Sequence, residues 1–178
     1  MVSESIFETV NTSIFETVNT SIFETVKIYI EIEQFSNIKY EWNKQTNQLE
    51  VDRILHKPYK YPYSYGFIIN TMASDNDELD ALIITDKYLK NDTYYNAYII
   101  GSLYMEDEKG VDEKVLCVLE EDYREIKDII DLPEDVKTNI SYFFANYKNN
   151  IKDKWSIVGE FLDREQTIDL YNKYKLKN

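Results

Sequence analysis

Two acidic clusters are the part of this sequence best suited to chemistry. Residues 75–80 read Asp-Asn-Asp-Glu-Leu-Asp and lie directly before the apolar run 81–84. The second cluster spans residues 107–112 and ends two positions before Lys114. Carboxylates gathered at the mouth of a strand repel one another unless cations lie between them. Because Mg²⁺ is held by a few carboxylates together with substrate phosphates, the clusters predict a site for divalent cations and phosphate.

Basic and phenolic side chains accompany these carboxylates. Lys39 and Glu41 are two positions apart and share one face of a strand, and Arg53 ends the next strand. Tyr147 and Lys148 end an amphipathic helical segment. Each of these alone is more simply explained as a solvated surface group. Together, Asp residues with Lys, Arg and Tyr suit metal-assisted phosphoryl transfer, in which metal ions activate water and cations neutralise phosphate charge.

Composition excludes several other kinds of site. The chain has 178 residues, a length that favours one domain with a real core. Its net charge of −13 opposes binding to long nucleic acids, although bound metal ions would still allow a small phosphate ligand. His56 is the only histidine, so a multi-His zinc site is excluded, and we place this residue in a loop before Pro58.

Two phosphate or metal motifs fail on spacing. Counted from Asp75, an EF-hand would need an oxygen ligand and a glycine where Leu79 and Asp80 stand. The four glycines are isolated, so the sequence contains no P-loop.

The single cysteine, Cys117, lies in the apolar run 115–119. We expect it to be a buried side chain rather than a nucleophile, and a reducing compartment suits it. The sequence has no run of about 18 apolar residues and no basic-then-apolar leader. We therefore expect a cytoplasmic protein with no membrane partner.

An eight-residue repeat forms the N-terminus. SIFETVNT occupies residues 5–12 and 13–20, and SIFETV follows at 21–26. An even period keeps the copies in register on a strand, whereas on a helix they would drift by about 80° per copy. We expect residues 1–25 to form a loose or edge-packed arm, with a partner-binding or self-pairing strand as the alternative, and residues 26–178 to form one domain.

Alternating apolar residues and turn signals predict strands along most of that domain. A hairpin is expected from residues 38–43 and 48–55, and further strands at 28–33, 81–85, 94–106, 113–119 and 155–161.

Helices are predicted mainly in the last third of the chain. Asp122 with Glu125 is expected to cap a short helix, and Asp163 with Gln166 resembles a capping box for a C-terminal helix. Between them, residues 133–135 suit the first turn of a helix whose apolar face is Val136, Ile140, Phe143, Phe144 and Tyr147. The order of elements indicates a mainly β (α+β) fold, a small β-barrel with flanking helices.

Short motifs follow one another in a fixed order between residues 26 and 161. They are IKYE at 38–41, VDR at 51–53, YPYSYGFI at 61–68, DNDELD at 75–80, MEDEKGVDEK at 105–114, DLP at 131–133 and FFANYK at 143–148. This set resembles the soluble (family I) inorganic pyrophosphatases, whose signature D-G-D-P-x-D falls at residues 75–80.

The resemblance implies an OB-like, five-stranded closed β-barrel that hydrolyses pyrophosphate to two phosphates with several Mg²⁺ ions. It implies that metal ions are held by Asp75, Asp80, Asp107 and Asp112, and through water by Glu31. Asp77 would accept the proton of the bridging water or fix its orientation, and Glu41 would orient its neighbours. The phosphates would be bound by Lys39, Arg53, Tyr65, Lys114, Tyr147 and Lys148.

This chain departs from the family pattern at several positions. Asn76 replaces the signature glycine and Glu78 its proline. Because Asn tolerates positive φ better than most residues, we expect the turn to survive, whereas Glu78 adds a negative charge. Tyr142 and Asn146 stand where bacterial members carry histidines that join trimers into hexamers. The resemblance thus implies a homo-oligomer, with the hexamer in doubt and a trimer still open.

Two alternatives from other classes remain. One is a non-catalytic metal- or phosphate-binding scaffold of the same fold that uses the repeat arm. The other is an OB-fold nucleic-acid binder, suggested by the fold and the many tyrosines and opposed by the charge of −13.

Overall fold

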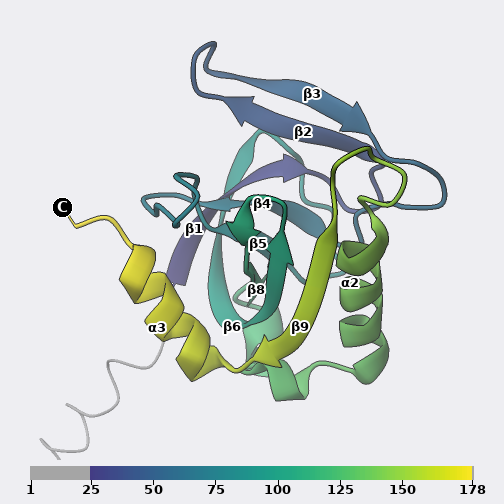
Figure 1. Ribbon diagram of the computed structural model, residues 1–178. Coiled ribbons are helices and arrows are strands. Elements are labelled where there is room, and N and C mark those ends of the chain that lie inside the picture. The colour runs from purple at the N-terminus through teal and green to yellow at the C-terminus, as the bar shows by residue number, and fades with distance from the viewer. Residues whose placement is uncertain (1–24, 178) are drawn as a thin grey trace, which may run out of the picture.

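The computed structural model describes residues 25–177 (Figure 1). The predicted N-terminal arm therefore lies outside the described residues, except for Thr25, which begins the first strand. Among the described residues, no helix is long and apolar enough to cross a membrane.

Five strands close into a ring. They are β1 (Thr25–Ile32), β4 (Ser64–Ile68), β5 (Asp80–Ile83), β8 (Lys114–Val118) and β6 (Thr93–Asp107). Neighbours in this order are hydrogen-bonded, and β6 returns to pair with β1. All of these pairings are antiparallel except the parallel pairing of β5 with β8. The predicted mainly β fold with a closed five-stranded barrel is confirmed.

Strand β6 has 15 residues, which is long enough for β1, β7, β8 and β9 all to pair with it. Its residues Thr93–Tyr98 pair with β1, and Ser102 and Leu103 pair with β8 on one side and with β9 (Ser156–Leu162) on the other. The register of β6 shifts between Ile99 and Gly101 against β8, and between Leu103 and Met105 against β9. Its last residues pair with the short β7 (Gly110–Val111). Asp107, the final residue of β6, is thereby fixed at the end of the barrel.

The same strands supply two buried clusters. Leu82 and Leu116 contribute to one, whereas their neighbours Ile83 and Cys117 contribute to the other. Successive side chains of a strand point to opposite faces, so each strand packs both of its faces. Cys117 is buried, as predicted, and burial raises the pKa of its thiol.

The predicted hairpin forms a separate two-stranded sheet. Strand β2 (Ile38–Asn43) pairs antiparallel with β3 (Gln48–Ile54), and neither pairs with the barrel strands. Figure 1 shows this hairpin lying across one end of the barrel. Exposed His56 follows it in a loop, where the sequence placed it.

Two α-helices flank the barrel. Helix α2 (Glu134–Asn146) begins after Pro133 and buries Ile140, Phe143 and Phe144, close to the prediction, although Val136 is only partly buried. Helix α3 (Arg164–Tyr174) has the predicted capping box. The Asp163 carboxylate accepts a bond from the Gln166 amide at 2.8 Å, and the Gln166 side chain accepts one from the Asp163 amide at 3.1 Å.

The expected cap at Asp122 is wrong. Residues Asp122–Arg124 form only a 3₁₀ turn, η1, whose N-cap is Glu121 and which has no side-chain cap bond. The capping box that the sequence analysis missed lies at the next 3₁₀ turn, η2 (Ile129–Asp131), where Asp128 and Asp131 bond each other's backbone amides. A single turn offers too few periodic residues for a sequence pattern to place its cap.

Candidate active site

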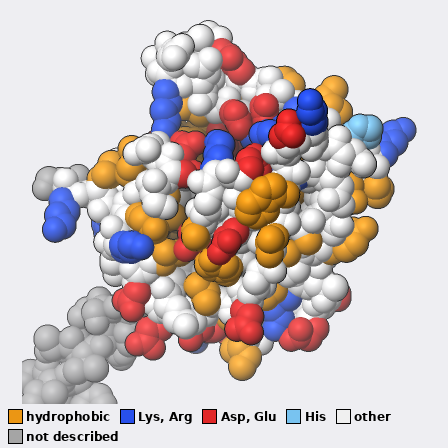
Figure 2. Space-filling view, in the orientation of Figure 1, with side chains coloured by type: hydrophobic (Ala, Val, Ile, Leu, Met, Phe, Trp, Pro, Cys, Tyr) orange, Lys and Arg blue, Asp and Glu red, His pale blue; other side chains and the backbone are white. Residues whose placement is uncertain are grey.

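A cavity of about 310 Å³ lies where the hairpin approaches the end of the barrel. Figure 2 shows acidic and basic side chains gathered there, below the hairpin. All of the predicted site residues line this cavity: Glu31, Lys39, Glu41, Arg53, Tyr65, Asp75, Asp77, Asp80, Asp107, Asp112, Lys114, Tyr147 and Lys148. The fold therefore brings together groups that the sequence scatters over seven strands, two loops and the end of a helix.

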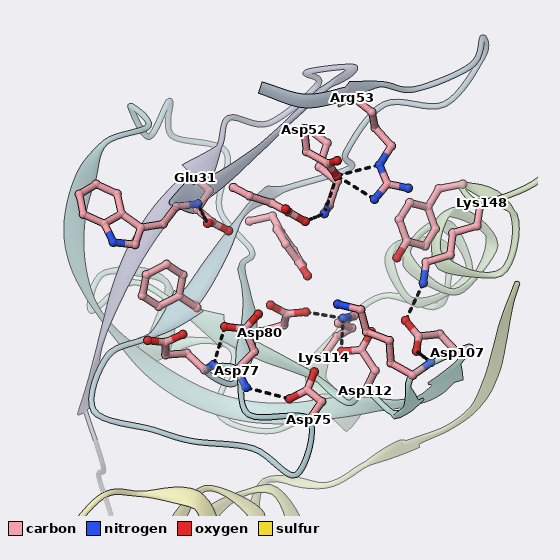
Figure 3. A pocket seen from close by; sticks show the side chains of 18 of the residues that line it. Glu31, Asp52, Arg53, Asp75, Asp77, Asp80, Asp107, Asp112, Lys114 and Lys148 are labelled. Atoms are coloured by element: carbon pink, nitrogen blue, oxygen red, sulfur yellow. Dashed lines mark hydrogen bonds and ion pairs between the residues drawn. The ribbon is translucent and has the colours of Figure 1, made fainter. Parts of the chain in front are cut away.

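Two opposed walls form the site (Figure 3). Asp80 opens β5 and Lys114 opens β8, and Asp112 lies in the short loop between β7 and β8, so these three side chains come from the end of the barrel. Arg53 comes from β3 of the hairpin and lies opposite them in Figure 3. Lys148 follows α2 and closes a third side of the cavity with Asp107.

The acidic loop before β5 has the turn that the sequence predicted. Asn76 has a φ of 67°, so asparagine takes the left-handed conformation that glycine adopts readily. The Asp75 carboxylate accepts a bond from the Asp77 amide at 3.1 Å, and the Asp77 carbonyl accepts one from the Ala73 amide at 2.7 Å. The loop therefore keeps a defined shape despite the replacement of the signature glycine.

Lys114 is the most buried charge in the cavity. Its side chain is 1% exposed, and its Nζ lies 2.5 Å from Asp80 Oδ2 and 2.5 Å from Asp112 Oδ1. Burial alone would lower the pKa of Lys114, but the two carboxylates outweigh it and raise that pKa above its ordinary value. Lys148 similarly lies 2.5 Å from Asp107 Oδ2 and 3.1 Å from Glu108 Oε2.

Burial shifts the pKa of two carboxyl groups, the buried Glu31 and the partly buried Asp112. Burial raises the pKa of Glu31 to about 8, against a single bond of 2.6 Å donated by the Trp42 amide. Burial also raises the pKa of Asp112 to about 6; Lys114 works to lower it and Asp80 adds to the rise. Carboxyl groups with raised pKa values in a polar cavity are suited to receive a further cation, and an all-oxygen donor set suits a hard one such as Mg²⁺.

Comparison with known sequences decides the family. The profile of the family described as inorganic pyrophosphatase matches residues 28–177. The inorganic pyrophosphatase of Helicobacter pylori (strain J99) is 39% identical over 150 residues, which cover 82% of this chain and 87% of that protein. The chain belongs to the inorganic pyrophosphatase family. A Nanoarchaeum equitans relative, also an inorganic pyrophosphatase, is 43% identical over 142 residues, covering 78% of this chain and 88% of its own.

A solved pyrophosphatase structure agrees with this assignment. The inorganic pyrophosphatase from Helicobacter pylori superposes with a TM-score of 0.82 at 37% identity, over 85% of this chain and 91% of that chain. The closed barrel is thus the OB-like barrel of the family, as the motif resemblance implied.

Phenolic groups of this pyrophosphatase-family site keep their protons. Tyr65 and Tyr147 are each 7% exposed, and burial raises the pKa of both well above its ordinary value. Their hydroxyls can therefore donate hydrogen bonds at neutral pH.

Sequence reasoning missed several groups that shape the cavity. Asp52 Oδ2 accepts from Arg53 Nε at 2.8 Å and lies 3.0 Å from Lys39 Nζ, so one carboxylate fixes two predicted phosphate-binding cations. Burial works to raise the pKa of Asp52, but these cations hold it below its usual value. The register of β2 and β3, which pairs Lys39 with Arg53, is the signal that could have found it. Other missed lining residues are Trp42, Lys44, Phe67, Glu78, Glu108, Lys109 and Lys154.

In residues 25–177, no three His, Cys, Asp or Glu side chains converge as a ready cluster of metal ligands. The ammonium groups of Lys114 and Lys148 lie against Asp80, Asp112 and Asp107 instead. A divalent ion at these carboxylates would require the two lysines to turn toward another anion, such as a phosphate.

The Glu31 shift predicts a pH-dependent stability. An unfolded Glu31 ionises near pH 4.5, whereas the folded carboxyl holds its proton to about pH 8. The folded state therefore binds more protons, and stability falls as pH rises through this window, by up to about 1.4 kcal/mol per pH unit. Without metal ions, Glu31→Gln should flatten this slope in urea titrations at pH 5 to 8. An unchanged slope would show that Glu31 is ionised in the folded protein.

Proposed function

We propose that this chain hydrolyses inorganic pyrophosphate to two phosphates with Mg²⁺ ions held in the cavity. As a member of the inorganic pyrophosphatase family, it is a hydrolase that acts on pyrophosphate. The observation that carries the proposal is the single cavity lined by both acidic clusters together with lysine, arginine and tyrosine side chains.

The proposed metal ligands are carboxylates alone. Asp75, Asp80, Asp107 and Asp112 would bind Mg²⁺ directly, and Glu31 would bind through water. The raised pKa values of Glu31 and of the partly buried Asp112 support this, because a bound cation would favour their ionised forms. When bound, such ions lower the pKa of a water ligand toward neutrality and neutralise phosphate charge.

The chain's own residues would bind and orient the substrate. Arg53 can hold a phosphate through two parallel bonds, whereas lysines act as point charges. In this proposal Lys39, Lys114 and Lys148 turn from their carboxylates to phosphate oxygens, and Tyr65 and Tyr147 donate hydroxyl bonds. Glu41, which pairs with Lys39, would orient that ammonium group. Asp77 would accept the proton of the attacking water.

We also propose a cytoplasmic homo-oligomer, a trimer or a hexamer, without nucleic-acid or membrane partners. The net charge of −13 supports the absence of nucleic acid, and a lone buried cysteine suits a reducing compartment. Exposed apolar side chains beside α2 and β9 support self-association: Ile130, Tyr142 and Ile157 are 80%, 57% and 62% exposed.

Phosphate release from pyrophosphate tests the activity. With millimolar Mg²⁺ we expect rapid release, and an excess of chelator should abolish it because the proposal relies on the bound ions to lower the pKa of the attacking water. Restoring Mg²⁺ should restore the rate. Folded protein that binds Mg²⁺ but releases no phosphate would overturn the proposal in favour of the binding-scaffold alternative, which is less favoured because every proposed metal and phosphate group is present.

A further inference from the structure

The two walls of the cavity belong to different sheets. Lys39 and Arg53 lie on the β2–β3 hairpin, whereas Asp80 and Lys114 lie on barrel strands and Asp112 in the loop that leads into β8. Because the hairpin shares no ladder of backbone bonds with the barrel strands, other contacts must set the distance between the walls. The position of the hairpin therefore decides where one half of the phosphate-binding charges stands.

One such contact is made by Trp42, the next-to-last residue of β2. The Trp42 amide donates to the Glu31 carboxyl at 2.6 Å, and the Trp42 ring meets the Tyr29 ring edge-on with centroids 5.3 Å apart. This contact leaves the turn of the hairpin, residues 44–47, to be held by something else.

A second contact is made at that turn. Lys44 Nζ lies 2.7 Å from Glu78 Oε2 and 3.1 Å from Asp77 Oδ1, so it bridges the hairpin and the acidic loop. The turn is defined on its own side, since the Asn43 side chain accepts from the Gln45 amide at 2.8 Å. On the loop side, Glu78 is the less exposed partner, with 21% of its side chain exposed against 53% for Lys44.

We propose that the Lys44–Glu78 ion pair is a clasp that positions the hairpin over the cavity, which makes Lys44 a positioning residue for pyrophosphate. The inference rests on the proposed function for its substrate. Glu78 stands where the family signature has proline, which carries no charge to pair with Lys44. In this chain Glu78 therefore has a role that proline could not fill. Its ion pair with Lys44 connects the hairpin, which carries Lys39 and Arg53, to the loop that carries Asp77.

The clasp predicts a specific kinetic pattern. The hairpin cations bind phosphate in the ground state and the transition state alike, so loosening them should raise KM and leave kcat within about twofold. Partly exposed ion pairs are weak, and we expect Lys44→Gln and Glu78→Gln each to raise KM about two- to fivefold. The double variant should be no worse than Lys44→Gln alone, because that change already removes the Lys44–Glu78 contact. Lys44→Arg should restore most of the loss.

Lys87 provides a matched control. It pairs with exposed Glu121 and does not line the cavity, so Lys87→Gln removes the same charge without touching the hairpin. KM should stay unchanged in this variant. An equal rise in KM would show that net charge, not the clasp, controls substrate binding.

A readout without turnover separates the clasp from the enzyme activity. In a Trp155→Phe background, Trp42 is the only tryptophan, and it lies on the hairpin. Acrylamide quenching of its fluorescence should increase in Lys44→Gln and Glu78→Gln and stay constant in Lys87→Gln. If Trp42 quenching increases in Lys44→Gln and Glu78→Gln but the unmodified protein does not hydrolyse pyrophosphate, the proposed function is wrong and the clasp is still supported. Unchanged quenching, additive KM effects, or increased quenching with an unchanged KM would overturn the positioning role.

Discussion

Replacing Asp77 with asparagine should lower kcat by a factor of roughly 100 to 10,000 while leaving Mg²⁺ binding largely intact. The loss is the size typical of removing a general base, because an amide of the same shape cannot accept the proton of the attacking water. Metal binding should persist since Asp77 is not among the proposed metal ligands. Steady-state phosphate release and calorimetric titration with Mg²⁺ measure the two effects separately.

The surroundings of Asp77 suit a base that is ionised at neutral pH. Partial burial works to raise the pKa of Asp77, but its interactions with Glu78 and Lys44 hold that pKa below its usual value. Asp86 is an exposed aspartate outside the cavity, and Asp86→Asn controls for the lost charge. Turnover near the original rate in Asp77→Asn would mean that another group accepts the proton.

The chemistry of the site could be predicted because it depends on residue types and on short spacings, both of which are read directly from the sequence. Clustered Asp residues with nearby Lys and Tyr indicate oxygen ligands for metal ions and positive charge for phosphate, and every predicted metal- or phosphate-site residue lines one cavity. Local alternation likewise placed β1, β6 and the β2–β3 hairpin within a few residues. The closed barrel itself came from the motif resemblance, since the pairing of β1 with β6 and of β5 with β8 joins distant segments.

Strand β4 shows why local patterns fail inside the barrel. Four of its five residues are buried, so no alternation marks it, and it contains Gly66, which weakens a strand prediction. The structure explains that glycine: a Cβ at position 66 would lie 1.8 Å from the Tyr29 carbonyl oxygen. The close approach of β1 that disguises the strand in the sequence is the reason that the position needs glycine.

Local sequence patterns also could not predict which side chains meet around the cavity. Alternation states which face a side chain takes, but not which distant group it meets. Asp52 binds two cations only because β2 and β3 pair in one register, and Lys44 reaches Glu78 only because the hairpin folds over the end of the barrel. Burial of Lys114 depends on β8 lying between β5 and β6, an order that local sequence does not encode.

Lys114→Met should destabilise the metal-free protein by about 3–5 kcal/mol and cut turnover as well. Lys114 is the buried partner of both Asp80 and Asp112, and removing one member of a buried ion pair leaves uncompensated charge in a poorly solvated place. Urea unfolding in chelator measures the loss. Lys87→Met, at an exposed pair, should change stability by no more than about 0.5 kcal/mol.

Magnesium turns this variant into a test of the metal site itself. An ion that binds the folded state stabilises it by mass action, and in Lys114→Met it would also supply the charge that Asp80 and Asp112 have lost. Millimolar Mg²⁺ should therefore raise the unfolding free energy of the variant more than that of the unmodified protein. Equal gains in both would show that the ion binds away from these carboxylates, and a loss below about 1 kcal/mol in chelator would show that Asp80 and Asp112 do not rely on Lys114.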